Sequence, residues 1–148
     1  MHKVFDSIFE NSLRILLLLN EFETEQNIDT IYVTDFISLY GKDFRISKNN
    51  LNGDNCYKFS EFASKRQLIQ KTLKHLVFKG LVLVINDNSG IKYKINDEGK
   101  TYCESLDSEY ANEYRENANK AINYLNSKSL RAVTKEINSM SLKRDLTV

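Results

Sequence analysis

The chain has 148 residues, of which 41% are hydrophobic and 28% charged, and its net charge at pH 7 is +1. This size and composition predict one globular domain, or one domain with a tail, whose core needs no disulfides. The balanced charge argues against a protein that is basic throughout and binds nucleic acid non-specifically. No apolar run approaches the roughly 20 residues of a membrane-spanning helix. The chain also meets Asp6 before any apolar run, so we expect neither a secretory leader nor membrane contact.

Two helices are predicted in the first part of the chain. Apolar residues recur at three- and four-residue spacing from Phe5 to about Glu23, which is typical of a buried amphipathic helix. A second helix is expected to begin after a cap at Asn27, Asp29 or Thr30 and to stop at Gly41. Residues 42–59 lack periodicity and contain an asparagine-rich loop at 49–55, with a short extended piece at 57–59.

The centre of the chain carries the strongest fold signal. A basic amphipathic helix is predicted over 60–79 and ends at Gly80. Two strands, 81–85 and 91–95, flank a turn at 86–90, and the next helix opens near Asp97. A helix, a hairpin and a helix in this order are typical of the second half of a winged helix. The predicted class is therefore mostly α (α+β), a winged helix-turn-helix with a two-stranded wing and additional C-terminal helices.

Three helices are predicted after the hairpin, over 97–106, 108–126 and 130–142. The last one is basic and has an apolar stripe, which must lie either against its own domain or against a partner. We therefore divide the chain into a winged-helix domain with helical extensions, 1–127, and a basic amphipathic C-terminal helix or tail, 128–148.

Charge is unevenly distributed along the chain. Residues 60–100 contain 8 basic and 4 acidic residues, and 128–148 contain 5 and 2, whereas the other segments are acidic. The helix and hairpin could thus contact double-stranded DNA or an acidic protein. Alternatively, the lysines only solvate a helix face and protect a strand edge from aggregation. The helix has a single arginine, which disfavours specific base readout. The candidate contact residues are Lys65, Arg66, Lys71, Lys74, Lys92 and Lys94.

The C-terminal half offers a second candidate surface. Tyrosine is favoured at interfaces as well as in cores, and several tyrosines crowd this half. The candidate partner-binding residues are Tyr110, Tyr114, Leu130, Val133, Ile137 and Met140.

Nothing in the sequence predicts catalysis. His2 and His75 have no cysteine or carboxylate at metal-ligand spacing, and there is no phosphate-binding loop or nucleophile motif. We expect no metal, no cofactor, no small-molecule substrate and no enzymatic activity. Cys56 and Cys103 stand alone, which favours free thiols in a reducing cytoplasm over a disulfide between them.

The order of elements and several short strings resemble a known family, over roughly residues 5–125. The chain is similar to the small middle component of bacterial ABC-three-component (ABC-3C) conflict systems, whose relatives include the small subunit of Lamassu-type anti-phage defence. The tail beyond about Ser127 falls outside the likeness. The strings that carry it are Phe5-Asp6-Ser7, Ser12 to Leu19, Tyr32 to Phe36, Ser60, Leu73, Leu76, Lys79 to Val82, Leu106 to Tyr110, Arg115 and Ala118.

The resemblance implies a non-catalytic adaptor that links an SMC- or Rad50-like ATPase to an effector, commonly a nuclease, in a defence complex. It assigns no catalytic residue to this chain. The alternative is a stand-alone winged-helix DNA-binding transcriptional regulator that dimerises through its terminal helices.

Overall fold

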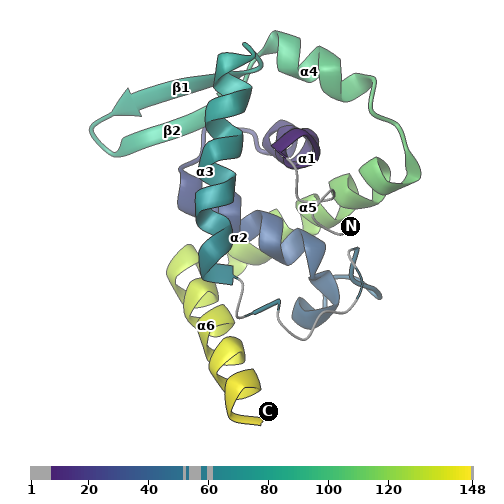
Figure 1. Cartoon of the computed structure of the whole chain (residues 1–148), viewed down its shortest axis with the longest axis vertical. Helices are drawn as coiled ribbons and strands as arrows, with labels where there is room; N and C mark the ends of the chain where they lie inside the picture. Colours follow the sequence, from purple (N-terminus) through teal and green to yellow (C-terminus); the bar gives the residue numbers. More distant parts are fainter. Residues whose placement is uncertain (1–7, 52, 54–57, 60–61, 148) are drawn as a thin grey trace.

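The computed structural model describes residues 8–51, 53, 58–59 and 62–147 (Figure 1). It confirms a mostly helical α+β protein whose sheet is two-stranded and antiparallel. The elements in chain order are α1 (Ile8–Glu21), α2 (Ile28–Leu39), the short 3-10 helix η2 (Gly41–Phe44), α3 (Phe62–Phe78), β1 (Val82–Asp87), β2 (Gly90–Ile95), α4 (Asp97–Glu104), α5 (Glu109–Lys128) and α6 (Leu130–Thr147).

The helix ends follow local chemistry and differ in detail from the predicted ones. The Asn27 Oδ1 accepts a hydrogen bond from the Thr30 N–H at 2.9 Å, so Asn27 is the cap among the three residues considered for α2. Gly41 follows the end of α2, but helical structure continues, because the 3-10 helix η2 begins at this residue. The last helix extends to Thr147 rather than 142. Phe5, Cys56 and Tyr57 lie outside the described residues.

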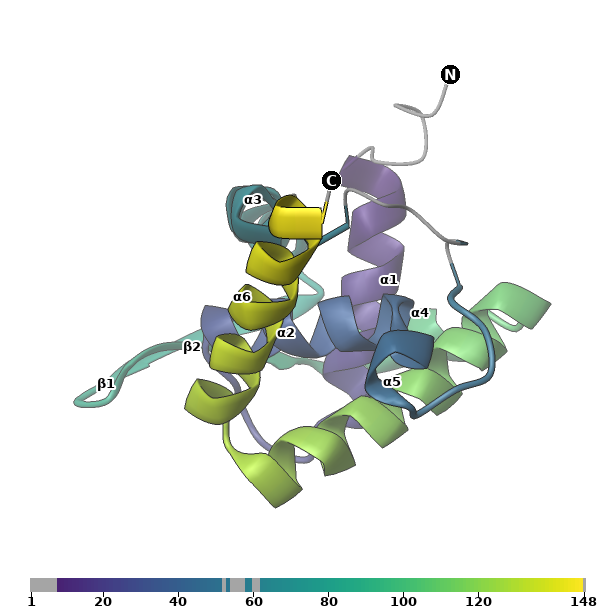
Figure 2. The same cartoon turned by 90° about the horizontal axis from the view of Figure 1, so that it is seen from below.

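Helix α2 forms the centre of the core. Every residue from Ile31 to Leu39 is buried, because α1, α3, α5 and α6 all pack around this helix (Figures 1 and 2). Two of its buried hydroxyls bond within the helix: Thr34 Oγ1 donates to Thr30 O at 2.6 Å, and Ser38 Oγ donates to Thr34 O at 2.7 Å. A third, the Tyr32 hydroxyl, donates to Phe62 O of α3 at 2.7 Å. The helix therefore buries polar side chains without leaving their donors unpaired.

Helix α3 ends as its glycine predicts. Gly80 has φ +77°, its N–H donates to Val77 O at 3.0 Å, and the Leu81 N–H donates to Leu76 O at 3.1 Å. These two bonds are the Schellman arrangement, which requires the left-handed conformation that glycine adopts most easily. The turn delivers the chain directly into β1.

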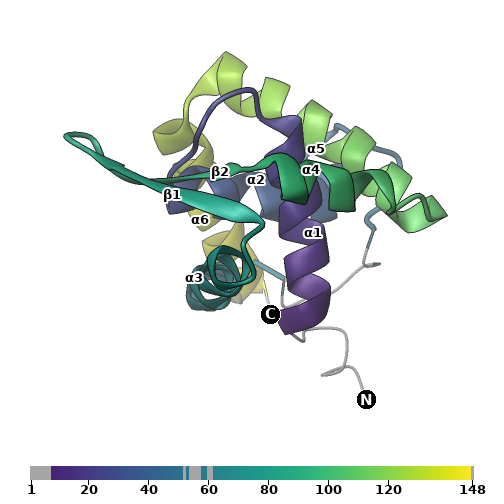
Figure 3. The ribbon, with the colours of Figure 1, turned by 90° about the horizontal axis from the view of Figure 1, so that it is seen from above.

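The hairpin projects from the helical body (Figures 1 and 3). Its register pairs Val82 with Ile95 at the buried base and Asp87 with Gly90 at the tip. A third β element that the sequence reasoning missed lies beside it: Gln26, between α1 and α2, forms an isolated antiparallel bridge with Tyr93. The order across this small sheet is therefore Gln26, β2 and β1, with β1 at the outside.

Helix α6 follows α5 after Ser129 and folds back onto its own chain, where it contacts α5 and α2. Val133 and Ile137 have no solvent-accessible surface. The sequence left open whether the apolar stripe of the basic terminal helix lies against its own domain or against a partner. In the structure, the helix packs this stripe against its own domain.

Candidate interaction surfaces

The basic helix α3 has one buried and one solvated side. Phe62, Ile69, Leu73 and Leu76 face the core, and α1 and α2 pack against them. Lysine and glutamine side chains cover the opposite side. Of the candidate residues on this helix, Lys71 and Lys74 are exposed, and Lys65 and Arg66 are half-buried.

Arg66 is already paired within the chain. Its Nε donates to Asp29 Oδ1 of α2 at 2.8 Å, and this hydrogen bond raises the pKa of the guanidinium. The two side chains are 44% and 52% exposed, so the pair contributes at most about 1 kcal/mol and can exchange for an external partner. The arginine that could have read a base edge is thus directed toward α2.

The two hairpin lysines lie on one face of the sheet. Lys92 pairs with Ile85 and Lys94 with Leu83, and directly opposed residues of an antiparallel pair share a face. Both lysines are half-buried, while Leu83 is 51% exposed. This face combines apolar side chains of β1 with cationic side chains of β2, which suits a protein surface better than a uniformly anionic phosphate backbone.

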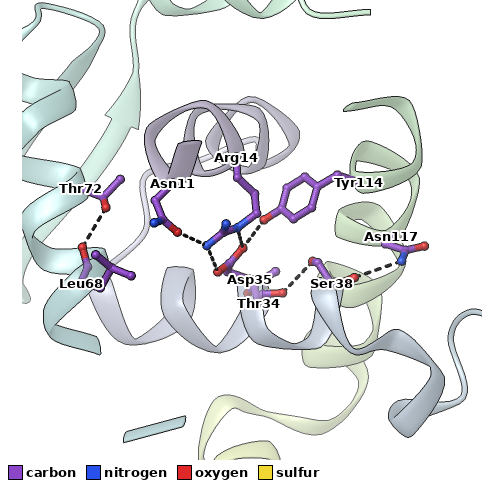
Figure 4. Close-up of polar contacts among 9 residues, drawn as sticks. All are labelled: Asn11, Arg14, Thr34, Asp35, Ser38, Leu68, Thr72, Tyr114 and Asn117. Atoms are coloured by element: carbon purple, nitrogen blue, oxygen red, sulfur yellow. Dashed lines mark hydrogen bonds and ion pairs between the residues drawn. The ribbon is translucent and has the colours of Figure 1, made fainter. Parts of the chain in front are cut away.

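A buried polar cluster, of which Tyr114 alone was among our sequence-based candidates, joins α1, α2 and α5 (Figure 4). Arg14 Nε donates to Asp35 Oδ1 at 2.8 Å and its Nη2 donates to Asp35 Oδ2 at 3.1 Å. The Tyr114 hydroxyl donates to the same Oδ1 at 2.6 Å, and Arg14 also donates to Asn11 Oδ1. The Arg14 and Asp35 side chains are only 11% and 5% exposed. We call these four residues the Arg14 cluster.

The electrostatics of the Arg14 cluster favour its charged form. Burial alone would lower the pKa of Arg14, but the adjacent Asp35 carboxylate outweighs it and raises that pKa. Burial, together with the negative charge of Asp35, raises the pKa of Tyr114 well above its ordinary value, so the phenol remains a donor. A paired charge with satisfied partners is a structural arrangement rather than a reactive one.

One sequence signal could have pointed to the cluster. Arg14 interrupts the leucine-rich stretch of α1, and Asp35 is the only charged residue in the mainly apolar segment 31–39. A charge on a buried helix needs an opposite charge, so each residue indicates a buried ion pair without showing which residue completes it.

Comparison with known families decides what kind of protein this is. The family described as ABC-three component (ABC-3C) system Middle Component 2 matches residues 4–145. The chain belongs to this family. No curated protein and no solved structure matches it.

The family match corrects the extent of the resemblance seen in the sequence. We placed the likeness over roughly 5–125 and the tail outside it, whereas the Middle Component 2 match continues through most of α6. This agrees with the packing of that helix, because its buried side chains belong to the same core as α2 and α5.

The second candidate surface of this middle component is largely internal. Tyr114, Val133 and Ile137 have no accessible surface and pack within the core of this chain. Leu130 and Met140 are half-buried against the same core. Of the six residues, Tyr110 alone is well exposed, at 43%. The periodic stripe therefore marks this protein's own core.

The other reactive groups that the structure describes are shielded or dispersed. Cys103 is buried and its thiol faces Leu16 O at 3.6 Å; burial raises its pKa to about 11. Within the described ranges, no group of three or more His, Cys, Asp or Glu residues is placed to hold a metal ion. Among those same residues, no helix has the length and hydropathy needed to cross a membrane.

Proposed function

We propose that this chain is a non-catalytic adaptor of a bacterial anti-phage or anti-plasmid complex related to Lamassu, and that it acts in the cytoplasm. It would link an SMC- or Rad50-like ABC ATPase to an effector, a nuclease. The observation that carries the proposal is the Middle Component 2 match over residues 4–145. The Arg14 cluster supports it, because this largely buried ion pair has its partners within the chain, which is typical of a structural role.

The arrangement of α1 to β2 supports a winged-helix module as the core of this adaptor. The Gln26 bridge lies between α1 and α2 and pairs with β2, so the chain order is helix, short strand, helix, helix and hairpin. Winged helices use this order. The long segment between α2 and α3 departs from the three- or four-residue turn of a simple helix-turn-helix.

An adaptor needs two surfaces, and the charge pattern provides them. Lys71 and Lys74 are exposed on α3, whereas Glu109, Glu113 and Glu116 are exposed on α5. Helix α1 lies between α3 and α5 and packs against both (Figures 1 and 3). We infer that the basic surface of α3 and the hairpin contacts an acidic partner, and that the acidic surface of α5 contacts a basic one.

Affinity purification of the tagged chain from cells that express its native operon tests the proposal. At moderate salt, mass spectrometry should identify an SMC-like ATPase and an effector in the eluate. Recovery of the chain alone, as a homodimer that shifts promoter DNA, would overturn the adaptor function in favour of a transcriptional regulator.

A further inference from the structure

The outer edge of β1 is open for strand pairing. Tyr93 N donates to Gln26 O at 2.8 Å and Gln26 N donates to Tyr93 O at 3.0 Å. Since the N–H and C=O of a strand residue point to the same side, Tyr93 turns both groups away from its β1 partner, Val84. Val84 therefore turns its own N–H and C=O outward. Asn86, two residues along, does the same.

No described residue from outside the hairpin forms a strand pair with that edge. Among the described parts of the chain, no backbone hydrogen bond from outside the hairpin reaches the residues of β1. Natural proteins normally protect such an edge with lysine, proline or a bulge. The stretch from Val82 to Ile85 has none of these, and the hairpin lysines lie on β2 instead. The edge-protection alternative considered from the sequence thus does not apply to the strand that needs it.

Apolar side chains accompany the open edge. Leu83 is 51%, Val84 48% and Ile91 52% exposed, and Phe78, at the end of the helix leading into β1, is 85% exposed. Leu83 lies on one face of the hairpin, because side chains alternate along a strand, and Val84 lies on the other. Ile91 shares the face of Val84, since Ile91 is paired with Asn86, two residues after Val84 on β1. A strand that pairs with β1 would cover apolar surface on both faces.

The surroundings of the edge are mainly cationic, with Asp87 at the hairpin tip as the acidic residue of β1. Lys92 and Lys94 share the face of Leu83 and Ile85. Strand β1 separates them from a strand added at its outer edge, so the two backbones lie two strand spacings, or roughly 10 Å, apart. A lysine and an acidic side chain can span this distance together. Exposed lysines of α3 and of the turn after it add to the same positive field; they are Lys71 and Lys74 on the helix and Lys79 in the turn.

We propose that β1 binds an extended acidic segment of another subunit of the complex, which adds to the sheet as a further strand. This inference rests on the proposed adaptor function and specifies how one of its contacts is made. Strand addition takes affinity from main-chain hydrogen bonds and specificity from alternate side chains. A second copy of this chain fits less well, because it would add another, mainly apolar β1 and not an acidic strand beside the lysines of β2.

A proline substitution tests the main-chain contact. Val84→Pro removes an outward N–H but none of the hydrogen bonds between β1 and β2, so the hairpin should persist. Val84→Thr is the matched control, since it keeps the N–H and a β-branched side chain. With the co-purifying subunit as ligand, we expect Val84→Pro to weaken binding about tenfold and Val84→Thr to bind within about threefold of wild type. Both variants should have a near-native circular dichroism spectrum, which would confirm that they fold.

Hydrogen exchange gives an independent readout. In the wild-type complex, the amides of Val84 and Asn86 should exchange more slowly than in the free chain. If the complex forms but these amides exchange unchanged and Val84→Pro binds like Val84→Thr, the inference fails and the adaptor function stands. If wild type co-purifies with no other subunit, the adaptor function fails and the inference fails with it.

Charge reversal distinguishes the occupants. Lys92→Glu with Lys94→Glu should weaken subunit binding about tenfold, whereas Lys48→Glu with Lys135→Glu, an equal charge change at exposed sites elsewhere, should not. Loss of duplex DNA binding by the first pair, with subunit binding intact, would overturn the proposal in favour of a nucleic-acid contact. A homodimer of the free chain that Val84→Pro dissociates would overturn it in favour of self-association.

Discussion

Replacing Asp35 with asparagine should lower the free energy of unfolding by about 3–5 kcal/mol, because it leaves the Arg14 guanidinium buried without its counter-ion. Asp35 accepts three hydrogen bonds, two from Arg14 at 2.8 and 3.1 Å and one from Tyr114 at 2.6 Å. The Arg14 side chain is 11% exposed, so water cannot replace the lost carboxylate. Native stabilities of about 5–15 kcal/mol make this loss a large fraction of the total.

A smaller change at the same cluster sets the scale. Tyr114→Phe removes one hydrogen bond to a charged acceptor and keeps the ion pair, so it should cost about 2 kcal/mol. Replacing both charges, with Arg14→Met and Asp35→Leu together, should recover more than half of the stability lost in Asp35→Asn, since no unpaired charge remains.

Urea unfolding followed by circular dichroism measures these differences. Glu113→Gln, an exposed carboxylate-to-amide change on α5, is the control and should stay within about 0.5 kcal/mol of wild type. A cost below about 1 kcal/mol for Asp35→Asn, or a larger cost for Tyr114→Phe than for Asp35→Asn, would refute the reasoning.

Three further outcomes are expected. Gly80→Ala should cost about 1 kcal/mol in the same assay because Gly80 has φ +77°, while a cost no larger than that of Lys79→Ala would show that the turn accepts alanine. In a Cys56→Ser background, iodoacetamide at pH 8 should label Cys103 only after unfolding, because the pKa of this buried thiol is raised to about 11; prompt labelling of the native chain would contradict its burial. Because the pKa of Tyr114 is raised in the folded state, the unfolded chain ionises first. The contribution of Tyr114 to the free energy of unfolding should thus be fully present below about pH 10 and be lost above it. The free energy of unfolding should therefore fall more steeply with pH in wild type than in Tyr114→Phe, and equal slopes would contradict this.

Local chemistry made much of the fold predictable. Apolar periodicity located the helices, and Gly80 marked both the end of α3 and the start of the hairpin, because only a left-handed residue closes that turn easily. The asparagine cap at Asn27 was among the predicted ones for the same reason.

Contacts between distant residues were not predictable in this way. The Gln26–Tyr93 bridge is an isolated pair, and a single residue such as Gln26 cannot show the alternation of polar and apolar residues by which a strand is predicted. The pairing of Arg14 with Asp35 depends on how α1 and α2 pack, so the sequence shows two buried charges but not their partnership.

The candidate surfaces likewise could be predicted only in part from the sequence. An apolar stripe on a helix requires a covering surface but does not say whose, and the stripe carrying Val133 and Ile137 is covered by this chain itself. Exposure of Lys71 and Lys74 followed from the helical period, whereas the Arg66–Asp29 pair depends on the crossing of α2 and α3.

The bridging function is tested most directly by reconstitution from the separate ATPase, effector and middle component. Immobilised ATPase should retain the effector only when the middle component is added, with all three subunits in the eluate. Equal retention of the effector without the middle component, or failure to retain it with the middle component present, would contradict the adaptor function.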